Sequence, residues 1–128
     1  MSDICETLEL RLNFGEDGKK LLPVVTQDYS SKDVLMVAFT NREAFEKTLE
    51  TGLATYWSRS RDKLWVKGAE ESGDFLKIKE IRVNCYQDSL LYMVEKVGKG
   101  VCHVKDENGD GMSSCYYRRI AGNGLEQV

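Results

Sequence analysis

Apolar residues fill every second position of the segment TLELRLNF, from Leu8 to Phe14. A period of two predicts a half-buried β-strand over residues 7–14. Further along, the run VLMVAF over residues 34–39 is apolar throughout. Such a run predicts a second strand that is covered on both faces.

The segment that follows this second strand carries the signals of an α-helix. Thr40 and Glu43 have the spacing of a capping box, which marks a helix start. Phe45 and Leu49 are four residues apart and are expected to share the buried face. Gly52 is placed to end the helix. We therefore expect one main helix between Thr40 and Gly52.

The remaining hydrophobic pattern is mostly that of short strands. Three more strands are expected over residues 53–57, 64–68 and 76–85. The apolar positions of the last one change parity between Ile78 and Ile81, which predicts a β-bulge. The run SLLYMV over 89–94 suits either a strand or a short helix. The pattern thus predicts one β-rich α+β domain over residues 1–128, with one main helix.

Composition narrows the class of protein. The chain has 128 residues, 41% of them hydrophobic, which is enough to bury a core without disulfides. A net charge of -3 argues against a broad nucleic-acid surface. The N-terminus lacks the apolar stretch of a secretory signal, and no apolar run is long enough to span a bilayer. We therefore expect a cytoplasmic protein whose four cysteines are reduced.

Two of those cysteines are placed symmetrically about a predicted turn. Asn108-Gly109 favours a type I′ hairpin turn, and Cys102 and Cys115 each lie six residues from it. Opposed residues in such a hairpin have Cβ atoms roughly 4.5–5.5 Å apart, close enough for two thiolates to share a zinc ion. The alternative is that the two thiols are small hydrophobic residues in the core.

A third cysteine and the only histidine extend this prediction. Cys85 lies at the end of a predicted strand, where it could add a third thiolate. Three thiolates with an open fourth position make a catalytic type of zinc site. His103 points to the other face of its strand, where it suits an acid or base that acts on bound water or substrate. Cys5 receives no role.

A basic turn between two tryptophans is the second candidate site. It combines arginine forks, hydroxyl groups and indole rings, which suit a phosphorylated nucleoside. The residues are Trp57, Ser58, Arg59, Ser60, Arg61, Trp65 and Lys67. The alternative is a surface turn flanked by two core tryptophans.

The motifs now form an ordered series that resembles a known family. In order they are LPVVTQD, DVLMVAFTNREAFEKTLETG, YWSRSR, LWVKG, KIKEIRVNC, VCH and SCYYRR. Over about residues 20–120 this series resembles the phosphoribosyl-AMP cyclohydrolases of histidine biosynthesis. The resemblance implies a homodimer of β-rich subunits with zinc sites at the interface. It also implies hydrolysis of the N1–C6 bond of the adenine ring in N1-(5-phosphoribosyl)-AMP.

The resemblance assigns roles to particular residues of this chain. It implies zinc on Cys85, Cys102 and Cys115, with the first contributed by the opposite subunit, and His103 as the neighbouring acid or base. The basic turn would contact the substrate phosphates through Arg59 and Arg61. Ser72 and Gly73 would lie in a nearby substrate-binding loop.

Departures from the family pattern put magnesium in doubt. The family usually has an Asp-Cys-Asp-x-Asp run that binds Mg²⁺, and this chain has Asn84 and Tyr86 at the first two aspartates. Asp88 is left as the only carboxylate of the run, a poor Mg²⁺ site. The usual LWHKG histidine is Val66, and the usual Cys-x6-Cys spacing is lengthened by six residues, which would keep the thiols opposed. The segment KGAEESG also has one residue more than the family's usual KGETSG, which leaves its phosphate contacts open.

These departures leave three functions open. The first is the cyclohydrolase with zinc as its cofactor. The second is a related zinc hydrolase acting on a different purine or amidine nucleotide. The third is a non-catalytic dimer in which zinc is structural.

Overall fold

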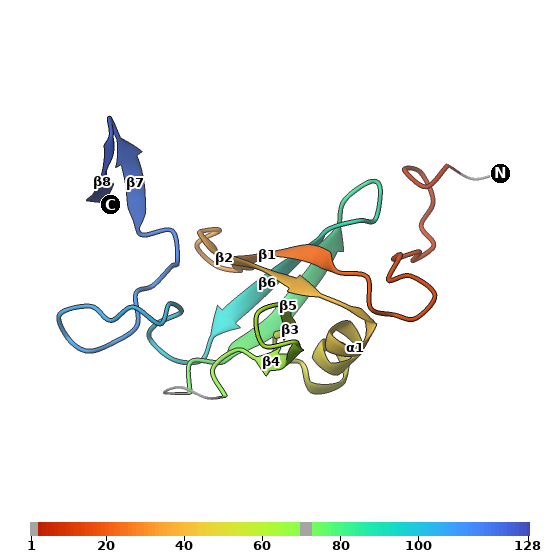
Figure 1. Ribbon diagram of the computed structural model, residues 1–128, viewed down its shortest axis with the longest axis horizontal. Coiled ribbons are helices and arrows are strands. Elements are labelled where there is room, and N and C mark those ends of the chain that lie inside the picture. The colour runs from red at the N-terminus through yellow and green to blue at the C-terminus, as the bar shows by residue number, and fades with distance from the viewer. Residues whose placement is uncertain (1–2, 70–72) are drawn as a thin grey trace.

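A four-stranded mixed sheet forms the centre of the computed structural model, which describes residues 3–69 and 73–128 (Figure 1). The strand order is β2-β1-β6-β5. The strands are β1 (Leu22–Asp28), β2 (Val34–Thr40), β5 (Leu76–Val83) and β6 (Leu90–Lys96). Strand β1 pairs antiparallel with β2 and parallel with β6, and β6 pairs antiparallel with β5.

One face of this sheet is covered by the helix α1 (Arg42–Thr51) and by the hairpin of β3 (Thr55–Ser58) and β4 (Lys63–Val66) (Figure 1). Alternate residues of the strands point into this layer. Val24 of β1, Tyr56 of β3 and Tyr92 of β6 are fully buried there. Because successive side chains of a strand point to opposite faces, the alternating apolar residues form a core on one face of the sheet. No helix of the described residues is long and apolar enough to cross a membrane.

The predicted helix is confirmed, and its start shifts by one residue. The N-cap is Asn41, whose Oδ1 accepts the N–H of Ala44 at 3.0 Å, so the predicted capping box from Thr40 is wrong. Gly52 ends the helix with φ 74° as predicted. The expectation that Leu49 is buried is also wrong, since it is 58% exposed. Thr48 takes the inner position instead, where its hydroxyl shares its proton between the carbonyls of Ala44 and Thr55 and accepts the N–H of Thr55.

The predicted strand over residues 7–14 does not form. Leu8 and Leu10 are exposed, while Leu12 and Phe14 pack against the core. No sheet pairing is recorded for this segment among the described residues. A strand needs a partner to satisfy its backbone, and hydrophobic alternation alone does not supply one.

Other strand predictions have mixed outcomes. The bulge in β5 is confirmed by a register shift between Ile78 and Glu80, and the ambiguous segment over 89–94 is a strand, β6. Strand β2 is covered on one face only: Val34 and Val37 are 44% and 45% exposed. Its prediction as a fully covered strand is therefore wrong for the single chain.

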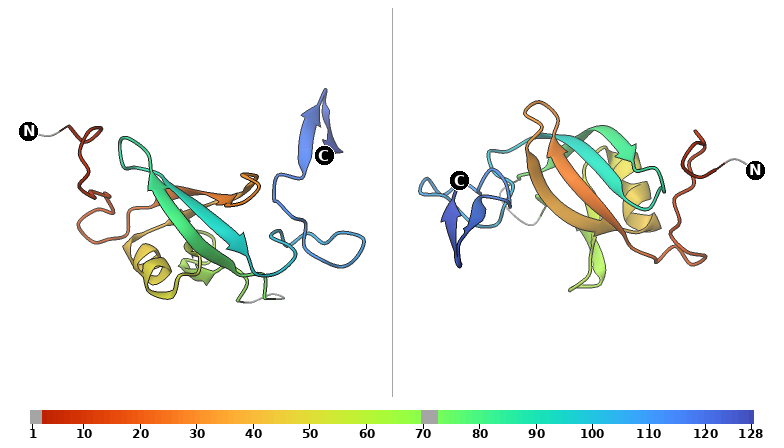
Figure 2. Two further views of the ribbon diagram at one scale, coloured as in Figure 1. Left: turned by 180° about the vertical axis from the view of Figure 1, so that it is seen from behind. Right: turned by 90° about the horizontal axis from the view of Figure 1, so that it is seen from above.

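The chain ends in a small exposed hairpin that the sequence pattern did not predict. Strands β7 (Arg118–Ala121) and β8 (Gly124–Gln127) pair antiparallel with each other. Both views in Figure 2 show this hairpin projecting away from the central sheet.

Candidate functional site

A groove of about 510 Å³ opens between the edge strand β2 and the β3–β4 hairpin. Strand β2 supplies one wall, and the hairpin supplies the other. The lining residues are Val37, Ala38, Phe39, Trp57, Ser58, Arg59, Ser60 and Trp65. The structure thus brings together five of the seven residues that the sequence analysis assigned to the basic turn.

The arginine of the groove is held by an aromatic ring. The guanidinium carbon of Arg59 lies 3.9 Å from the centre of the Phe39 ring. A cation over a ring face at this distance is attracted by the ring quadrupole. The sequence pattern did not predict a role for Phe39, because the apolar run VLMVAF indicated a covered strand rather than the wall of a groove.

The turn between β3 and β4 presents hydroxyl groups beside this arginine. Ser58 Oγ accepts the backbone N–H of Arg61 at 3.3 Å and lies 3.5 Å from Ser60 Oγ. The Trp65 ring packs at 5.5 Å from the buried ring of Tyr56. The groove therefore combines a fixed cation, hydroxyl groups and an anchored indole, which together can bind a phosphate and a planar base.

Lys67 is not part of the open groove, because it is only 3% exposed. The structure therefore places it in the interior rather than on the groove wall with Arg59. Of the predicted substrate-binding loop, Gly73 has a left-handed backbone with φ 82°, and Ser72 lies outside the residues that the structure describes.

A buried carboxylate packs against the segment that carries Cys102. Asp74 is 6% exposed. A Cβ placed on Gly98 would lie 2.0 Å from one carboxylate oxygen of Asp74, and a Cβ on Gly111 would lie 3.6 Å from the other. That same Cβ on Gly111 would lie 2.5 Å from the Cys102 carbonyl oxygen. Only glycine fits at positions 98 and 111 without a shift of the surrounding atoms, and the sequence pattern did not predict this notch.

The predicted cysteine hairpin does not form as a ladder, because the only sheet pairing among the described residues between β6 and β7 is one isolated bridge, Lys105 with Gly111. Gly109 has φ 82°, whereas a type I′ turn would need a positive φ at Asn108 as well. The Asp106 N–H donates to the Asp110 carbonyl at 2.7 Å, so the loop is one residue longer than predicted. Asp106 Oδ1 accepts the N–H groups of Asn108 and Asp110, which stabilises this wider loop.

As a consequence, Cys102 and Cys115 are not opposed across a ladder. The N–H of Cys102 donates to the Met112 carbonyl at 3.0 Å. The N–H of Cys115 donates to the carbonyl of Leu35 on β2 at 2.8 Å. Cys102 is buried, and Cys115 is exposed beside the sheet. The prediction that the six extra residues keep the two thiols opposed is therefore wrong.

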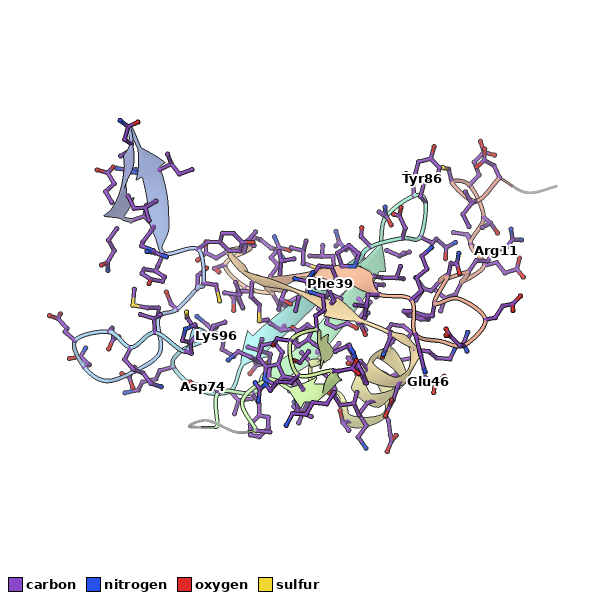
Figure 3. The ribbon with its side chains drawn as sticks, in the orientation of Figure 1. Arg11, Phe39, Glu46, Asp74, Tyr86 and Lys96 are labelled. Carbon is purple, nitrogen blue, oxygen red and sulfur yellow. The ribbon has the colours of Figure 1, made fainter. Side chains whose placement is uncertain are left out.

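Cys85 lies at the other end of the sheet, in the loop between β5 and β6. Figure 3 shows its neighbour Tyr86 and the β6 residue Lys96 at opposite ends. Within the described residues of one chain, no three Cys, His, Asp or Glu side chains are grouped to hold a metal. One chain alone therefore does not bring the three predicted thiolate ligands together. His103 is exposed next to Cys102.

The fold and the groove define a small α+β protein with a cationic, aromatic-lined groove. The model of the family Phosphoribosyl-AMP cyclohydrolase matches residues 36–117. A phosphoribosyl-AMP cyclohydrolase of Desulfatibacillum aliphaticivorans is 47% identical over 119 residues, which cover 93% of this chain and 89% of that protein. The chain belongs to the phosphoribosyl-AMP cyclohydrolase family.

Two further relatives show how far the similarity extends. A phosphoribosyl-AMP cyclohydrolase of Archaeoglobus fulgidus is 50% identical over 114 residues, 89% of this chain and 96% of that protein. The histidine biosynthesis bifunctional protein HisIE of Aquifex aeolicus is 46% identical over 118 residues. This chain spans 53% of that bifunctional protein.

Proposed function

We propose that this protein is a phosphoribosyl-AMP cyclohydrolase of histidine biosynthesis, which hydrolyses the N1–C6 bond of the adenine ring in N1-(5-phosphoribosyl)-AMP. The observation that carries the proposal is the groove beside β2, which places Arg59 with Ser58, Ser60 and two indoles. Relatives about half identical over most of their length bear the name of this enzyme.

The groove supplies binding energy away from the reacting bond. Arg59 on the groove wall and Arg61 in the adjoining turn, outside the groove lining, bind the two phosphates of the substrate, and the hydroxyls of the turn add donors. The purine carries a substituent at N1, which makes the ring cationic and C6 electrophilic. Trp57 and Trp65 stack on planar parts of the ligand. Binding energy from the phosphates holds C6 in a fixed place for attack.

As the family resemblance implies, Cys102 and Cys115 of one chain would hold zinc together with Cys85 of a second chain. Three thiolates are a donor set that suits zinc and leaves one position open. When bound, the ion would supply a water nucleophile near neutral pH. The positions of the three cysteines support a homodimer, since the β5–β6 loop that carries Cys85 lies at the opposite end of the sheet from the segment after β6 that carries Cys102 and Cys115. His103 takes a proton from the attacking water and returns it to the departing N1.

The open face of the sheet is the surface we assign to the second chain. The register places Val25 of β1, Val37 of β2 and Leu91 of β6 side by side on this face. Val37 is 45% exposed in the single chain. Contact with a second copy would cover this apolar surface and bring a second Cys85 into reach.

A related zinc hydrolase for another purine or amidine nucleotide is the second candidate. The replacements at Asn84, Tyr86 and Val66 favour it, since each removes a titratable group that the family resemblance implies. An assay on N1-(5-phosphoribosyl)-AMP, combined with complementation of a histidine auxotroph lacking this step, tests the proposal. We expect turnover and growth; binding of zinc without turnover of this substrate would refute the cyclohydrolase.

Mixed dimers test the shared zinc site. Cys85→Ser and Cys102→Ser chains should each be inactive as homodimers. In a mixed dimer, one site combines Cys102 and Cys115 of the first chain with Cys85 of the second and is intact. Unfolding and refolding an equal mixture should therefore restore about a quarter of wild-type zinc and activity. Ligands contributed by a single chain would give no recovery.

A further inference from the structure

The loop between β5 and β6, which carries Cys85, is ordered by a side-chain amide. Asn84 Oδ1 accepts the backbone N–H groups of Asp88 and Ser89, each at 2.9 Å. Asn84 Nδ2 donates to the carboxylate of Asp88. The Asn84 N–H also donates to the Ser89 carbonyl at 3.2 Å. Asn84, at the start of the loop, is thus hydrogen-bonded to Asp88 and Ser89 at its end.

A second amide fastens the same loop to the N-terminal segment. Gln87 Oε1 accepts the N–H of Arg11 at 2.6 Å, and its Nε2 donates to the carbonyl of Glu9 at 2.9 Å. Gln87 is 5% exposed, although it lies on a surface loop. Figure 3 shows Arg11 beside the loop that carries Tyr86. Both polar ends of the Gln87 amide are therefore satisfied by backbone that is distant in sequence.

The backbone of Gln87 adopts an unfavourable conformation, which the side-chain contacts help to stabilise. Gln87 has φ 55°, in the left-handed region that favours glycine. A glutamine at this φ is less favourable in conformational energy than a glycine would be. The two hydrogen bonds to residues 9 and 11 offset that cost.

The same contacts leave the loop with no oxygen set for magnesium. Asp88 is its only carboxylate, and that carboxylate accepts from Asn84. The oxygen of Asn84 is directed at two N–H groups rather than outward. Mg²⁺ requires octahedral oxygen ligands and is usually bound through carboxylates. The residues present therefore do not fit a magnesium ion.

We propose that Asn84 and Gln87 are positioning residues for Cys85, and that their amides hold its loop in place without a bound cation. The proposal rests on the proposed function, in which Cys85 is a zinc ligand supplied to the partner chain. Groups that orient a ligand from behind commonly change metal affinity 10–100-fold when they are removed.

The first experiment removes the Gln87 amide without straining the backbone. Gln87→Gly keeps the left-handed φ and loses both hydrogen bonds; Gln87→Glu keeps an acceptor for Arg11 but has no donor for Glu9. The matched control is Gln27→Ala, because Gln27 Nε2 also donates to a backbone carbonyl, that of Lys32. Zinc affinity is measured by chelator competition, alongside the midpoint of thermal unfolding.

We expect zinc affinity to fall about 10–100-fold in Gln87→Gly, to fall less in Gln87→Glu and to stay unchanged in Gln27→Ala. A cobalt-substituted Gln87→Gly protein should also show altered thiolate-to-metal absorption. Unchanged zinc affinity in Gln87→Gly would overturn the proposal, and so would an equal loss in the control.

A second experiment tests independence from magnesium. The unfolding temperature of the wild-type protein should not move with added Mg²⁺. The double variant Asn84→Asp/Tyr86→Asp, which gives the loop three carboxylates, should become more stable as Mg²⁺ is added. Stabilisation of the wild-type protein by Mg²⁺ would overturn the proposal.

Hydrogen exchange separates this proposal from the proposed function. In zinc-free protein, the N–H of Arg11 should be protected, and Gln87→Gly should abolish that protection. Rapid exchange of the Arg11 N–H in the wild-type protein would show that its hydrogen bond to Gln87 is absent, and would overturn the proposal whatever the protein catalyses. A wild-type protein without zinc affinity would instead overturn the proposed function, and with it the role of Cys85, while the exchange result still tests the loop.

Discussion

The guanidinium of Arg59 lies over the ring of Phe39, 3.9 Å from its centre. Phe39 belongs to the edge strand β2, and Arg59 belongs to the turn that follows β3. The contact therefore joins the two walls of the groove and limits the orientations of the arginine before any ligand binds. An arginine that is already oriented loses less conformational entropy when it binds a phosphate.

Substitutions at these two positions should affect substrate binding to different extents. Arg59→Ala removes a charged phosphate contact and should raise KM about 10–100-fold. Phe39→Leu keeps the arginine but loses the cation–π contact, and should raise KM about 2–5-fold with kcat unchanged. Steady-state kinetics measure both. An equal effect of the two variants would show that Phe39 acts by shaping the groove rather than by orienting Arg59.

His103 should affect the rate rather than metal binding. It is exposed next to Cys102, so removing its side chain leaves the buried neighbour in place. His103→Ala should keep zinc and lower kcat by about 10²–10⁴, the range for loss of a proton-transfer group. Elemental analysis and kinetics on the same sample decide the point. Loss of zinc together with activity would make His103 a ligand.

The glycine notch around Asp74 predicts a steric effect on stability. The Cβ of Gly98→Ala would lie 2.0 Å from a carboxylate oxygen of the buried Asp74, so one of the two groups must move. We expect a loss of about 1–3 kcal/mol in the free energy of unfolding, measured with urea. The control is Gly124→Ala, where the nearest atom to the new Cβ is 4.0 Å away. A neutral Gly98→Ala would show that the notch is not tightly packed.

Two buried tyrosines predict loss of stability at high pH. Burial raises the pKa of Tyr92 to about 12, and it raises the pKa of Tyr56 still further above its usual value. A tyrosine in the unfolded chain titrates near about 10. Because the folded pKa is higher, the stabilisation is fully present below about pH 10 and is lost as the pH rises from there towards about 12. Tyr92 should contribute a fall of about 2–3 kcal/mol over that interval.

Urea unfolding of wild-type protein and Tyr92→Phe between pH 9 and 12 checks this expectation, since these pH values span the unfolded titration near ~10. The Tyr92 hydroxyl has no well-formed hydrogen bond among the described residues, so the substitution itself should cost little. The variant should lose less stability than wild type as the pH rises. Tyr116→Phe, at a residue that is 55% exposed, is the control. Parallel curves for wild type and Tyr92→Phe would contradict the expectation.

Local chemistry explains which parts of the fold were predictable. Gly52 ends the helix because a left-handed C-cap favours glycine in any surroundings, and the parity change between Ile78 and Ile81 reports a bulge directly. The alternation from Leu8 to Phe14 led to a wrong strand prediction, because strand formation depends on a partner elsewhere in the chain. The prediction of a cysteine hairpin was wrong for a local reason, because Asp106 accepts two N–H groups and enlarges the turn.

The sequence by itself determined the class of domain, the residues of the basic turn and the family, since these depend on short-range periodicity and on the identity of residues in order. Only the tertiary structure decided that Phe39 lies against Arg59, that Lys67 is buried, and that the β5–β6 loop with Cys85 lies at the far end of the sheet from the segment after β6 with Cys102. Each of these relations joins segments that are brought together by burial of a common core. Burial is a property of the whole packed chain, so no local pattern could specify such contacts.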